Sequence, residues 1–212
     1  GLNDSLKRLQ LDYVDIYYAH RFDDTVALEE TVNALDQTVR DGKALYIGIS
    51  NYDTKQTKEA IAMFKDLHTP FVLNQYSYNM FNRTAETSGL INALKADGAG
   101  LIAYGPLSEG LLSDRYLKGI PDTFKIHPTN KATFAKGKEA VVKQLNALNE
   151  IAHDRDQTLS QMALAWLLRD PVVTSVIIGT TSVEHLQDNL KATEHLTFTA
   201  EEIQQIDDIL NA

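Results

Sequence analysis

The chain has 212 residues, no cysteine and a formal net charge of -9, from 29 acidic and 20 basic side chains. The negative charge argues against a general surface for nucleic acid or anionic membranes, and the lack of cysteine excludes disulfides, thiol catalysis and thiolate metal sites. No run approaches the roughly 18 apolar residues of a membrane span, and nothing at the start resembles a signal peptide. We therefore expect a cytoplasmic protein of one domain, residues 1–212.

Apolar spacing and turn residues predict alternating strands and helices. In chain order these are the end of a helix at 3–9, a strand at 11–21, a helix at 27–40, a strand at 44–50, a helix from about 53, a strand at 71–75, a helix at 87–96, a strand at 100–104, helices at 139–152 and 159–168, a strand at 172–178 and a helix at 199–210. The first strand is apolar or aromatic at nearly every position, so we expect both of its faces to be covered.

The first four strands start about every 30 residues, which is typical of strand-helix-strand units with a parallel sheet. The sequence therefore predicts an α/β fold. Residues 105–138 form a long loop rich in Gly, Pro, Asp and Lys, and a loop of this length is more often functional than idle. Capping-box spacing is present at Asp53 and Gln56 and at Thr199 and Glu202.

Polar residues or glycine follow each predicted strand, and in a barrel they would meet on one rim. They are His20-Arg21, Ser50-Asn51, Asn74-Gln75, Tyr104-Gly105 and Gly179-Thr180-Thr181. Ser50, Asn51 and Gln75 could fix an amide ligand such as nicotinamide, and Tyr104 offers a flat face for stacking. The alternatives are turn formation for Ser50 and Asn51, a structural amide for Gln75 and a core aromatic residue for Tyr104. His20 is the first candidate for a catalytic residue. The alternative is that its side chain merely caps a loop.

The stretch from 179 to 190, GTTSVEHLQDNL, predicts a binding site for an anion. Thr181 and Glu184 have capping-box spacing, so Thr180 and the nearby backbone N–H groups would present partial positive charge, for which phosphate is the obvious ligand. Arg115 and Lys125 could close over it, unless they are simply solvated. The six histidines show no metal-ligand spacing, and no G-x-G-x-x-G motif, Walker loop or G-x-S-x-G elbow is present.

Several segments together resemble the aldo-keto reductase family. They are SLKRLQLDYVDIYYAH, GKALYIGISNY, NQYSYN, AYGPLSEGLLSDRYLKGIP, QMALAWLLRDP and VIIGTTSVEHLQDNL, and they cover essentially the whole chain. The similarity is greatest to the branch of bacterial L-glyceraldehyde 3-phosphate reductases and potassium-channel β-subunits. It implies a (β/α)8 TIM barrel that binds NADP(H) without a Rossmann motif and reduces small aldehydes and ketones by hydride transfer.

The resemblance also implies roles for individual residues. His20 matches the catalytic histidine, and we place Arg21 on the substrate side. Cofactor contacts are implied for Ser50, Asn51, Gln75, Tyr104, Gly105, Pro106, Leu107, Arg115, Lys125, Gly179, Thr180, Thr181, His185, Asp188 and Asn189. Because His185 stands where glutamine or arginine is more usual, NAD stays possible beside NADP.

The chain departs from the family pattern at its front. Three strands that would carry the catalytic aspartate, the general-acid tyrosine and its lysine have no match, so we expect an N-terminally truncated barrel of about five strands. The parent activity is then weak or absent, and a homo-oligomer or a complementing N-terminal segment would be needed. The alternative is a non-catalytic nucleotide-binding or assembly module, and a third reading is a sugar-phosphate isomerase.

Overall fold

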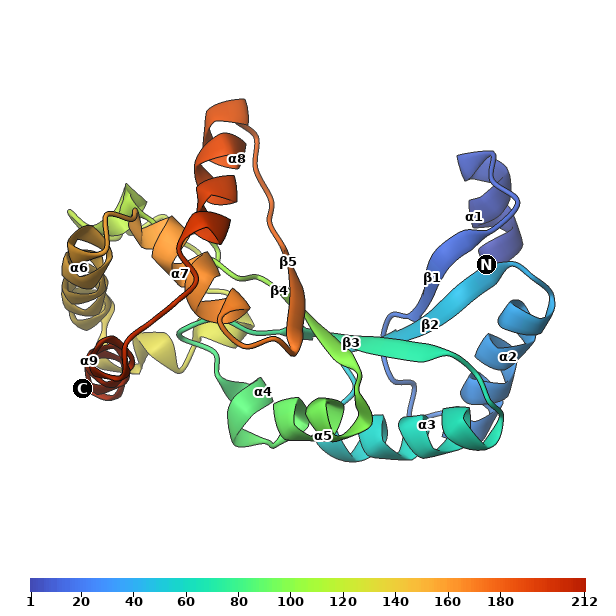
Figure 1. Ribbon diagram of the computed structural model, residues 1–212. Helices are drawn as coiled ribbons and strands as arrows, with labels where there is room; N and C mark the ends of the chain where they lie inside the picture. Colours follow the sequence, from blue (N-terminus) through green and yellow to red (C-terminus); the bar gives the residue numbers. More distant parts are fainter. The chain divides into compact units, whose positions relative to one another are not determined.

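A computed structural model describes residues 1–212, and the chain divides into two compact units. The first contains Gly1–Tyr76 and Ala85–Ile102, and the second contains Ser77–Thr84 and Ala103–Ala212. The strands are β1 (Val14–Ala19), β2 (Ala44–Ser50), β3 (Phe71–Ser77), β4 (Gly100–Tyr104) and β5 (Val173–Ile177), in the sheet order β1-β2-β3-β4-β5 (Figure 1). The predicted α/β fold with about five strands is confirmed.

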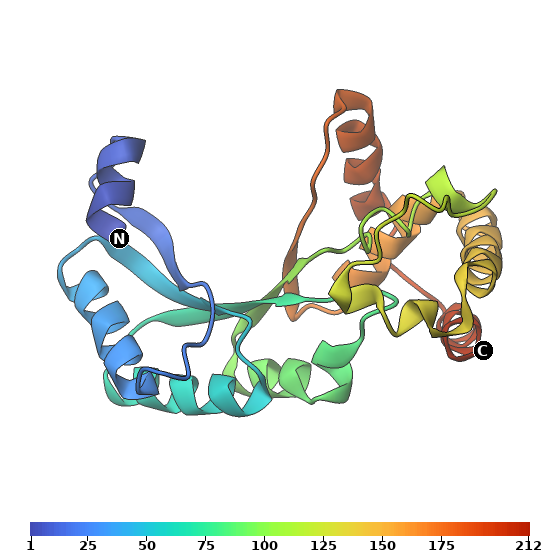
Figure 2. The ribbon, with the colours of Figure 1, turned by 180° about the vertical axis from the view of Figure 1, so that it is seen from behind.

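The first unit is a layer of strands covered on one face by helices. Its helices are α1 (Leu2–Leu9), α2 (Leu28–Arg40), α3 (Thr54–Asp66) and α5 (Leu90–Asp97), and the short α4 (Thr84–Thr87) begins at the boundary. Both views place α2 and α3 on the same face of β1 and β2 (Figures 1 and 2). Apolar side chains fill this layer, with Val32 and Leu35 of α2 packed against Ile47 and Ile49 of β2 and Phe64 of α3.

Parallel pairing aligns the carboxyl ends of the first three strands. In β1 and β2, Ala19 is paired with Ile49, and in β2 and β3, Ser50 is paired with Gln75. The residues that follow these strands therefore lie at one edge of the first unit, as expected for a parallel sheet.

The prediction that both faces of the first strand are covered is wrong. The strand spans only Val14–Ala19, its residues are half-buried apart from the exposed Asp15, and the preceding Tyr13 is 48% exposed. The reason is that the helices α2 and α3 lie on one and the same face of β1 and β2; in addition, β1 is an edge strand that pairs with β2 alone. Strand composition reports apolar content but not the position of a strand in its sheet.

The second unit is mainly helical. It contains α6 (Lys138–Asp154), α7 (Leu159–Leu168), α8 (Val183–Leu190) and α9 (Ala200–Asn211), with the 3-10 helices η1 (Asp114–Tyr116), η2 (Pro128–Asn130), η3 (Thr133–Lys136) and η4 (Lys191–Glu194). Helix α7 is apolar on all sides and is almost wholly buried, as is typical of a core helix. Trp166, Met162 and Leu167 of α7 are fully buried.

The structure also tests the predicted helix ends. The capping boxes at Asp53 and Gln56 and at Thr199 and Glu202 are confirmed. The helix predicted at 87–96 is α5, which starts three residues later, at Leu90, because Gly89 has a φ of 78° and forms its N-cap; the separate short helix α4 ends at Thr87. No helix has the length and apolar character needed to cross a membrane.

Candidate functional site

The ends of β1, β2 and β3 are held together by hydrogen bonds from one asparagine. The Asn51 Nδ2 group donates to the His20 carbonyl oxygen at 3.1 Å and to Ser50 Oγ at 3.0 Å. The Asn51 backbone N–H donates to the Gln75 carbonyl oxygen at 3.0 Å. Asn51 has a φ of 60°, a left-handed conformation that asparagine tolerates better than most residues. We call His20, Ser50, Asn51 and Gln75 the strand-end cluster.

The four side chains of this cluster differ in exposure. Ser50 is 2% exposed, Asn51 and Gln75 are half-buried, and His20 is exposed beside the exposed Arg21. Only the backbone carbonyl of His20 is bonded to the cluster, so its imidazole does not act as the loop cap that the alternative interpretation required. The cluster therefore offers fixed polar groups on β2 and β3 and an accessible imidazole at the end of β1.

Tyr18 reaches across β2 toward this cluster. Burial raises the pKa of the Tyr18 phenol, and a hydrogen bond with the Gln75 side chain offsets part of that rise. The ring passes over Gly48, where an added Cβ would lie 2.8 and 2.9 Å from two Tyr18 ring carbons and 3.2 Å from Leu73 Cδ1. Glycine at position 48 is therefore needed for the tyrosine to lie across the strand.

We expect Gly48→Ala to destabilise the chain by about 1–3 kcal/mol, because the new methyl group overlaps the Tyr18 ring. Thermal unfolding measures the cost. In a Tyr18→Ala background the obstruction is gone, so the same glycine substitution should cost much less. An equal cost in both backgrounds would show that the ring of Tyr18 does not require the glycine.

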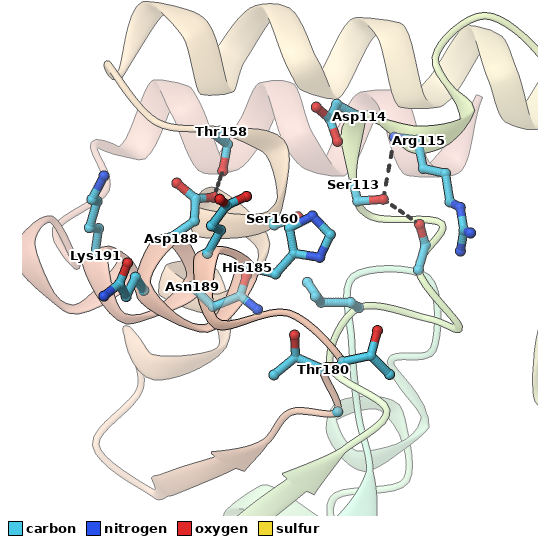
Figure 3. A pocket seen from close by; sticks show the side chains of 16 residues that line it. Ser113, Asp114, Arg115, Thr158, Ser160, Thr180, His185, Asp188, Asn189 and Lys191 are labelled. Carbon is cyan, nitrogen blue, oxygen red and sulfur yellow. Dashed lines mark hydrogen bonds between the residues drawn. The ribbon is translucent and has the colours of Figure 1, made fainter.

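The second unit contains a groove of about 1300 Å³ (Figure 3). Three segments line it, namely the loop after β4, the start of α7 and the stretch that contains α8. The lining residues are Leu107, Gly110, Ser113, Asp114, Arg115, Thr158, Ser160, Gly179, Thr180, Thr181, Glu184, His185, Gln187, Asp188, Asn189 and Lys191.

The wall formed by α8 begins one residue later than predicted. Thr181 and Glu184 were expected to form a capping box, but the N-cap is Ser182, whose Oγ accepts from the His185 backbone N–H at 3.4 Å. The Thr180 hydroxyl donates to the Ser182 carbonyl at 3.0 Å and accepts from its N–H at 3.2 Å. This local turn moves the helix start, since threonine hydroxyls compete with helical hydrogen bonding.

Basic side chains and hydroxyl groups gather in the groove, beside the carboxyl groups of Asp114, Glu184 and Asp188. Arg115 enters from the loop after β4, His185 from the first turn of α8, and Lys191 from the residue after it. The Arg115 guanidinium lies 5.8 Å from the centre of the Tyr116 ring, and its backbone N–H donates to Ser113 Oγ. Free N–H groups at the start of α8 add partial positive charge. Together with Thr180 and Thr181, these groups can bind a phosphate.

The groove contains eight of the residues predicted from the sequence, and others lie elsewhere. Those that line it are Leu107, Arg115, Gly179, Thr180, Thr181, His185, Asp188 and Asn189. Gly105 and Pro106 do not line it, although the Gly105 carbonyl accepts a 2.8 Å hydrogen bond from Asn79. Lys125 is exposed and also lies outside the lining, and the Tyr104 carbonyl accepts from the Tyr78 N–H. The roles of all these residues stay predictions.

Sequence reasoning missed six polar residues of the groove, Ser113, Asp114, Thr158, Ser160, Gln187 and Lys191. Thr158 had a detectable signal, because it stands three residues before Gln161 at the start of a predicted helix, which is capping-box spacing. The other five follow no such pattern and come from separate segments: Ser113 and Asp114 from the loop after β4, Ser160 from α7, and Gln187 and Lys191 from α8 and the residue after it.

Known proteins are similar to this chain in sequence. The model of the aldo/keto reductase family matches residues 1–211. L-glyceraldehyde 3-phosphate reductase of Escherichia coli O157:H7 is 44% identical over 211 residues, covering 98% of this chain and 61% of that protein. A protein of Oryza sativa subsp. japonica named "Probable voltage-gated potassium channel subunit beta" is 36% identical, covering 96% of this chain and 63% of that protein.

A solved structure also has a similar fold. The glycerol dehydrogenase AKR11B4 from Gluconobacter oxydans matches with a TM-score of 0.82 at 25% identity, covering 99% of this chain and 62% of that one. The chain thus spans about three fifths of the length of the relatives it matches. Its five strands correspond to an incomplete (β/α)8 barrel, because a closed barrel of this type has eight.

Proposed function

Since the chain belongs to the aldo/keto reductase family, we propose that its groove binds the adenosine and phosphate groups of NADP(H). The observation that carries this proposal is the gathering of Arg115, the Thr180 and Thr181 hydroxyls and the start of α8 around one groove. A guanidinium and helix N–H groups are strong hydrogen-bond donors to phosphate. His185 can add charge when protonated, and NAD remains the alternative cofactor.

We propose a second role for the strand-end cluster, which can hold a carboxamide such as that of nicotinamide. The Ser50 hydroxyl, the Asn51 amide and the Gln75 side chain offer donors and acceptors at one edge of β2 and β3. Bound NADPH supplies the hydride, and the exposed His20 imidazole would orient and polarise a substrate carbonyl, with Arg21 beside it. Tyr104, Gly105, Pro106 and Lys125 keep their proposed cofactor contacts.

The activity proposed for the whole protein is the reduction of small aldehydes or ketones, in the cytoplasm and within a single domain over 1–212. Glyceraldehyde phosphates and methylglyoxal are the proposed substrates. The similarity to an L-glyceraldehyde 3-phosphate reductase supports a small carbonyl substrate. Titration of NADPH against the purified chain, followed by nicotinamide fluorescence, tests the cofactor part of the proposal. Saturable binding in the micromolar range supports it, and no binding up to millimolar NADPH refutes it.

Replacing the arginine of the groove should weaken binding. We expect Arg115→Gln to raise the Kd for NADPH about 10- to 100-fold, because a charge-assisted hydrogen bond to phosphate contributes about 1.5–3 kcal/mol. Lys118→Gln is the matched control, since Lys118 is an exposed cation of the same loop that does not line the groove. Equal effects of the two substitutions would mean that only the general charge of the loop matters. Lys125→Gln, measured in parallel, tests the other predicted cation.

A second candidate function is a nucleotide-binding or assembly module without turnover. The observation that favours it is the edge of β1, beside which lies a depression of about 590 Å³. Leu2, Tyr17, Ala19 and Val26 contribute apolar surface to this depression. Exposed strand edges pair readily with other strands. A second copy or a complementing segment could therefore dock there, and a stable complex that binds NADPH without reducing aldehydes would favour this function.

A further inference from the structure

Helix α8 carries an apolar stripe that takes no part in the groove. The groove residues of this helix are Glu184, His185, Gln187, Asp188 and Asn189. The residues of α8 that remain are Val183, Leu186 and Leu190, and we call them the α8 stripe. Val183 is 71% and Leu190 59% exposed, more than any other large apolar side chain of the chain. The apolar side of an amphipathic helix normally packs against a core, so this stripe is an uncovered packing surface.

The spacing of these residues suits packing against a second helix. Val183, Gln187 and Leu190 follow the i, i+4, i+7 pattern of a coiled-coil seam, and Leu186 flanks that seam on one side. Both views show α8 apart from α6 and α9 within the second unit (Figures 1 and 2). Exposed apolar patches of this kind mark sites of protein–protein contact.

The other flank of the seam is charged, and its charges complement themselves in reverse order. Glu184 lies in the first turn of α8, and Lys191 is its C-cap residue. They are about two helical turns apart and therefore lie on the same flank. Both are exposed, and neither forms an ion pair within the chain. This flank is thus acidic at the start of the helix and basic at its end.

These features identify a second copy of α8, in antiparallel orientation, as the fitting partner. A two-fold axis between antiparallel helices brings the same flank of each copy together, so Leu186 meets Leu186 and Glu184 meets Lys191. A parallel pair would bring the Leu186 flank of one copy against the charged flank of the other. Antiparallel helices also place opposite ends of their dipoles side by side.

We propose that the α8 stripe is the contact between two copies of this chain, with Val183 of one copy against Leu190 of the other. The contact is isologous, so it closes at two copies. Because two turns of helix bury less surface than a standard interface, we expect a weak dimer with a Kd of about 10–100 µM. The inference goes beyond the proposed function and needs no nucleotide, because none of the three stripe residues lines the groove.

Sedimentation velocity of the purified chain at about 1–500 µM measures the dimer. We expect Leu190→Gln to raise the dimer Kd at least about 100-fold, because the symmetric contact loses one buried leucine from each copy. Leu190 is exposed in the single chain, so this substitution keeps the fold. Leu11→Gln is the matched control, since Leu11 is 52% exposed but lies in the first unit. It should leave the Kd unchanged.

Reversal of the charges tests the pairing of the flanks. Glu184→Lys places two like-charge pairs in the dimer and should raise its Kd about 10-fold. Adding Lys191→Glu makes both pairs attractive again and should return the Kd to within about 2-fold of its original value. A double variant that dimerises as weakly as the single variant contradicts the antiparallel arrangement.

Single cysteines test the orientation of the helices, because the chain contains none of its own. Under mild oxidation Gln187→Cys should give a disulfide-linked dimer, since position 187 lies near the axis. Val183→Cys alone should not, because antiparallel packing separates the two copies of this position by roughly 10 Å, beyond the reach of a disulfide. A mixture of Val183→Cys and Leu190→Cys should link. A Val183→Cys chain that links to itself contradicts the antiparallel order.

Three results overturn the inference. They are a chain that stays monomeric at about 500 µM, a dimer that Leu190→Gln leaves intact, and a dimer that Leu11→Gln weakens instead, which moves the contact toward the edge of β1. Each of them leaves the proposed binding of NADPH untouched, because that binding is measured by nicotinamide fluorescence on the same chain.

Discussion

The purified chain is expected to bind NADPH and yet to reduce aldehydes at least about 10² to 10⁴ times more slowly than an enzyme with a positioned general acid. Reduction of a carbonyl leaves an alkoxide that must be protonated. No tyrosine-lysine pair for this step matches the family pattern in the sequence, and His20 is an exposed imidazole held only through its backbone carbonyl. Absorbance loss of NADPH with methylglyoxal, on a sample of confirmed intact mass, measures the rate.

The Tyr18 phenol is hydrogen-bonded to Gln75 of the strand-end cluster, but it is a poor substitute for a general-acid tyrosine paired with a lysine. Burial raises its pKa, and its one hydrogen bond is to the neutral Gln75 side chain rather than to a lysine. A weaker acid transfers its proton less readily. Tyr18→Phe should therefore leave the residual rate unchanged. If the unmodified chain reduces aldehydes much faster than its His20→Ala variant, the prediction of slow reduction is contradicted. That result would support a working catalytic site in these 212 residues.

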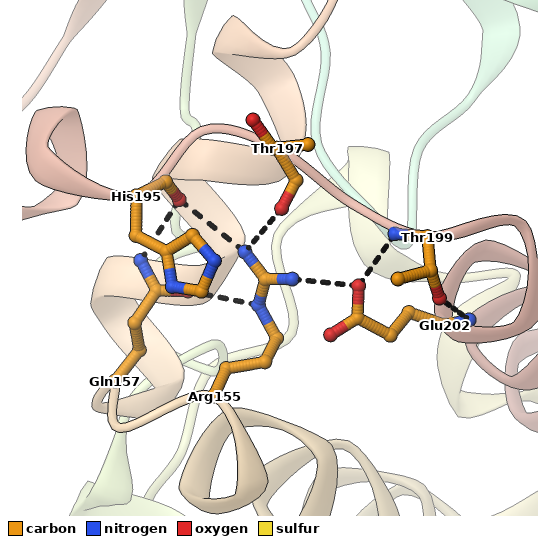
Figure 4. Close-up of polar contacts among 6 residues, drawn as sticks. All are labelled: Arg155, Gln157, His195, Thr197, Thr199 and Glu202. Atoms are coloured by element: carbon orange, nitrogen blue, oxygen red, sulfur yellow. Dashed lines mark hydrogen bonds and ion pairs between the residues drawn. The ribbon is translucent and has the colours of Figure 1, made fainter.

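Arg155→Ala is expected to cost about 3–5 kcal/mol of the free energy of unfolding, as is typical when one partner of a buried ion pair is removed. The Arg155 side chain is only 2% exposed and lies between α6 and α7 (Figure 4). It donates to the carbonyls of His195 at 3.3 Å and Thr197 at 3.0 Å, and it pairs with Glu202 at 2.8 Å. Its guanidinium also stacks 3.7 Å from the centre of the Phe198 ring.

This arginine ties the segment before α9 to the core of the second unit. Its removal would leave the Thr197 carbonyl without its donor and would reduce the His195 carbonyl and the Glu202 carboxylate to the donors Gln157 and Thr199. The melting temperature should fall by about 6–20 °C for a chain of this size. Arg8→Ala is the control, because Arg8 is exposed and bonds only Ser5 Oγ; we expect a change within about 0.5 kcal/mol. An Arg155 variant as stable as the Arg8 variant would contradict the role assigned to this cluster.

The same cluster gives the unfolding free energy an acid dependence. Burial would raise the pKa of Glu202, but hydrogen bonds from Thr199 and Arg155 and the positive charges of Arg155 and His195 hold it below its usual value of 4.5. A lowered pKa in the folded chain contributes stability above the unfolded pKa, and that contribution is lost as the pH falls through the folded value. In Arg155→Ala the pKa of Glu202 should rise, so this contribution shrinks.

The strands and the parallel α/β fold could be predicted from the sequence, because these features depend on local patterns, and half of the residues that line the groove were predicted from such patterns together with the family resemblance. Apolar runs mark strands, turn residues mark their ends, and parallel strands bring those ends to one edge. The strand-end cluster follows from this rule. Within the groove, the helix-start spacing pointed to Thr180, whereas His185 and Asp188 were implied only by the resemblance to the family.

Tertiary structure alone decided which strand is an edge and what the buried polar groups bind. Gln161 reaches Asp188 across 27 residues, and Arg155 reaches Thr197 across 42. Two of the acceptors of Arg155 are backbone carbonyls, which every residue carries and which therefore leave no trace in the sequence. The choice among them depends on how α6, α7 and the segment before α9 pack, and that packing sets the donors that remain for a ligand.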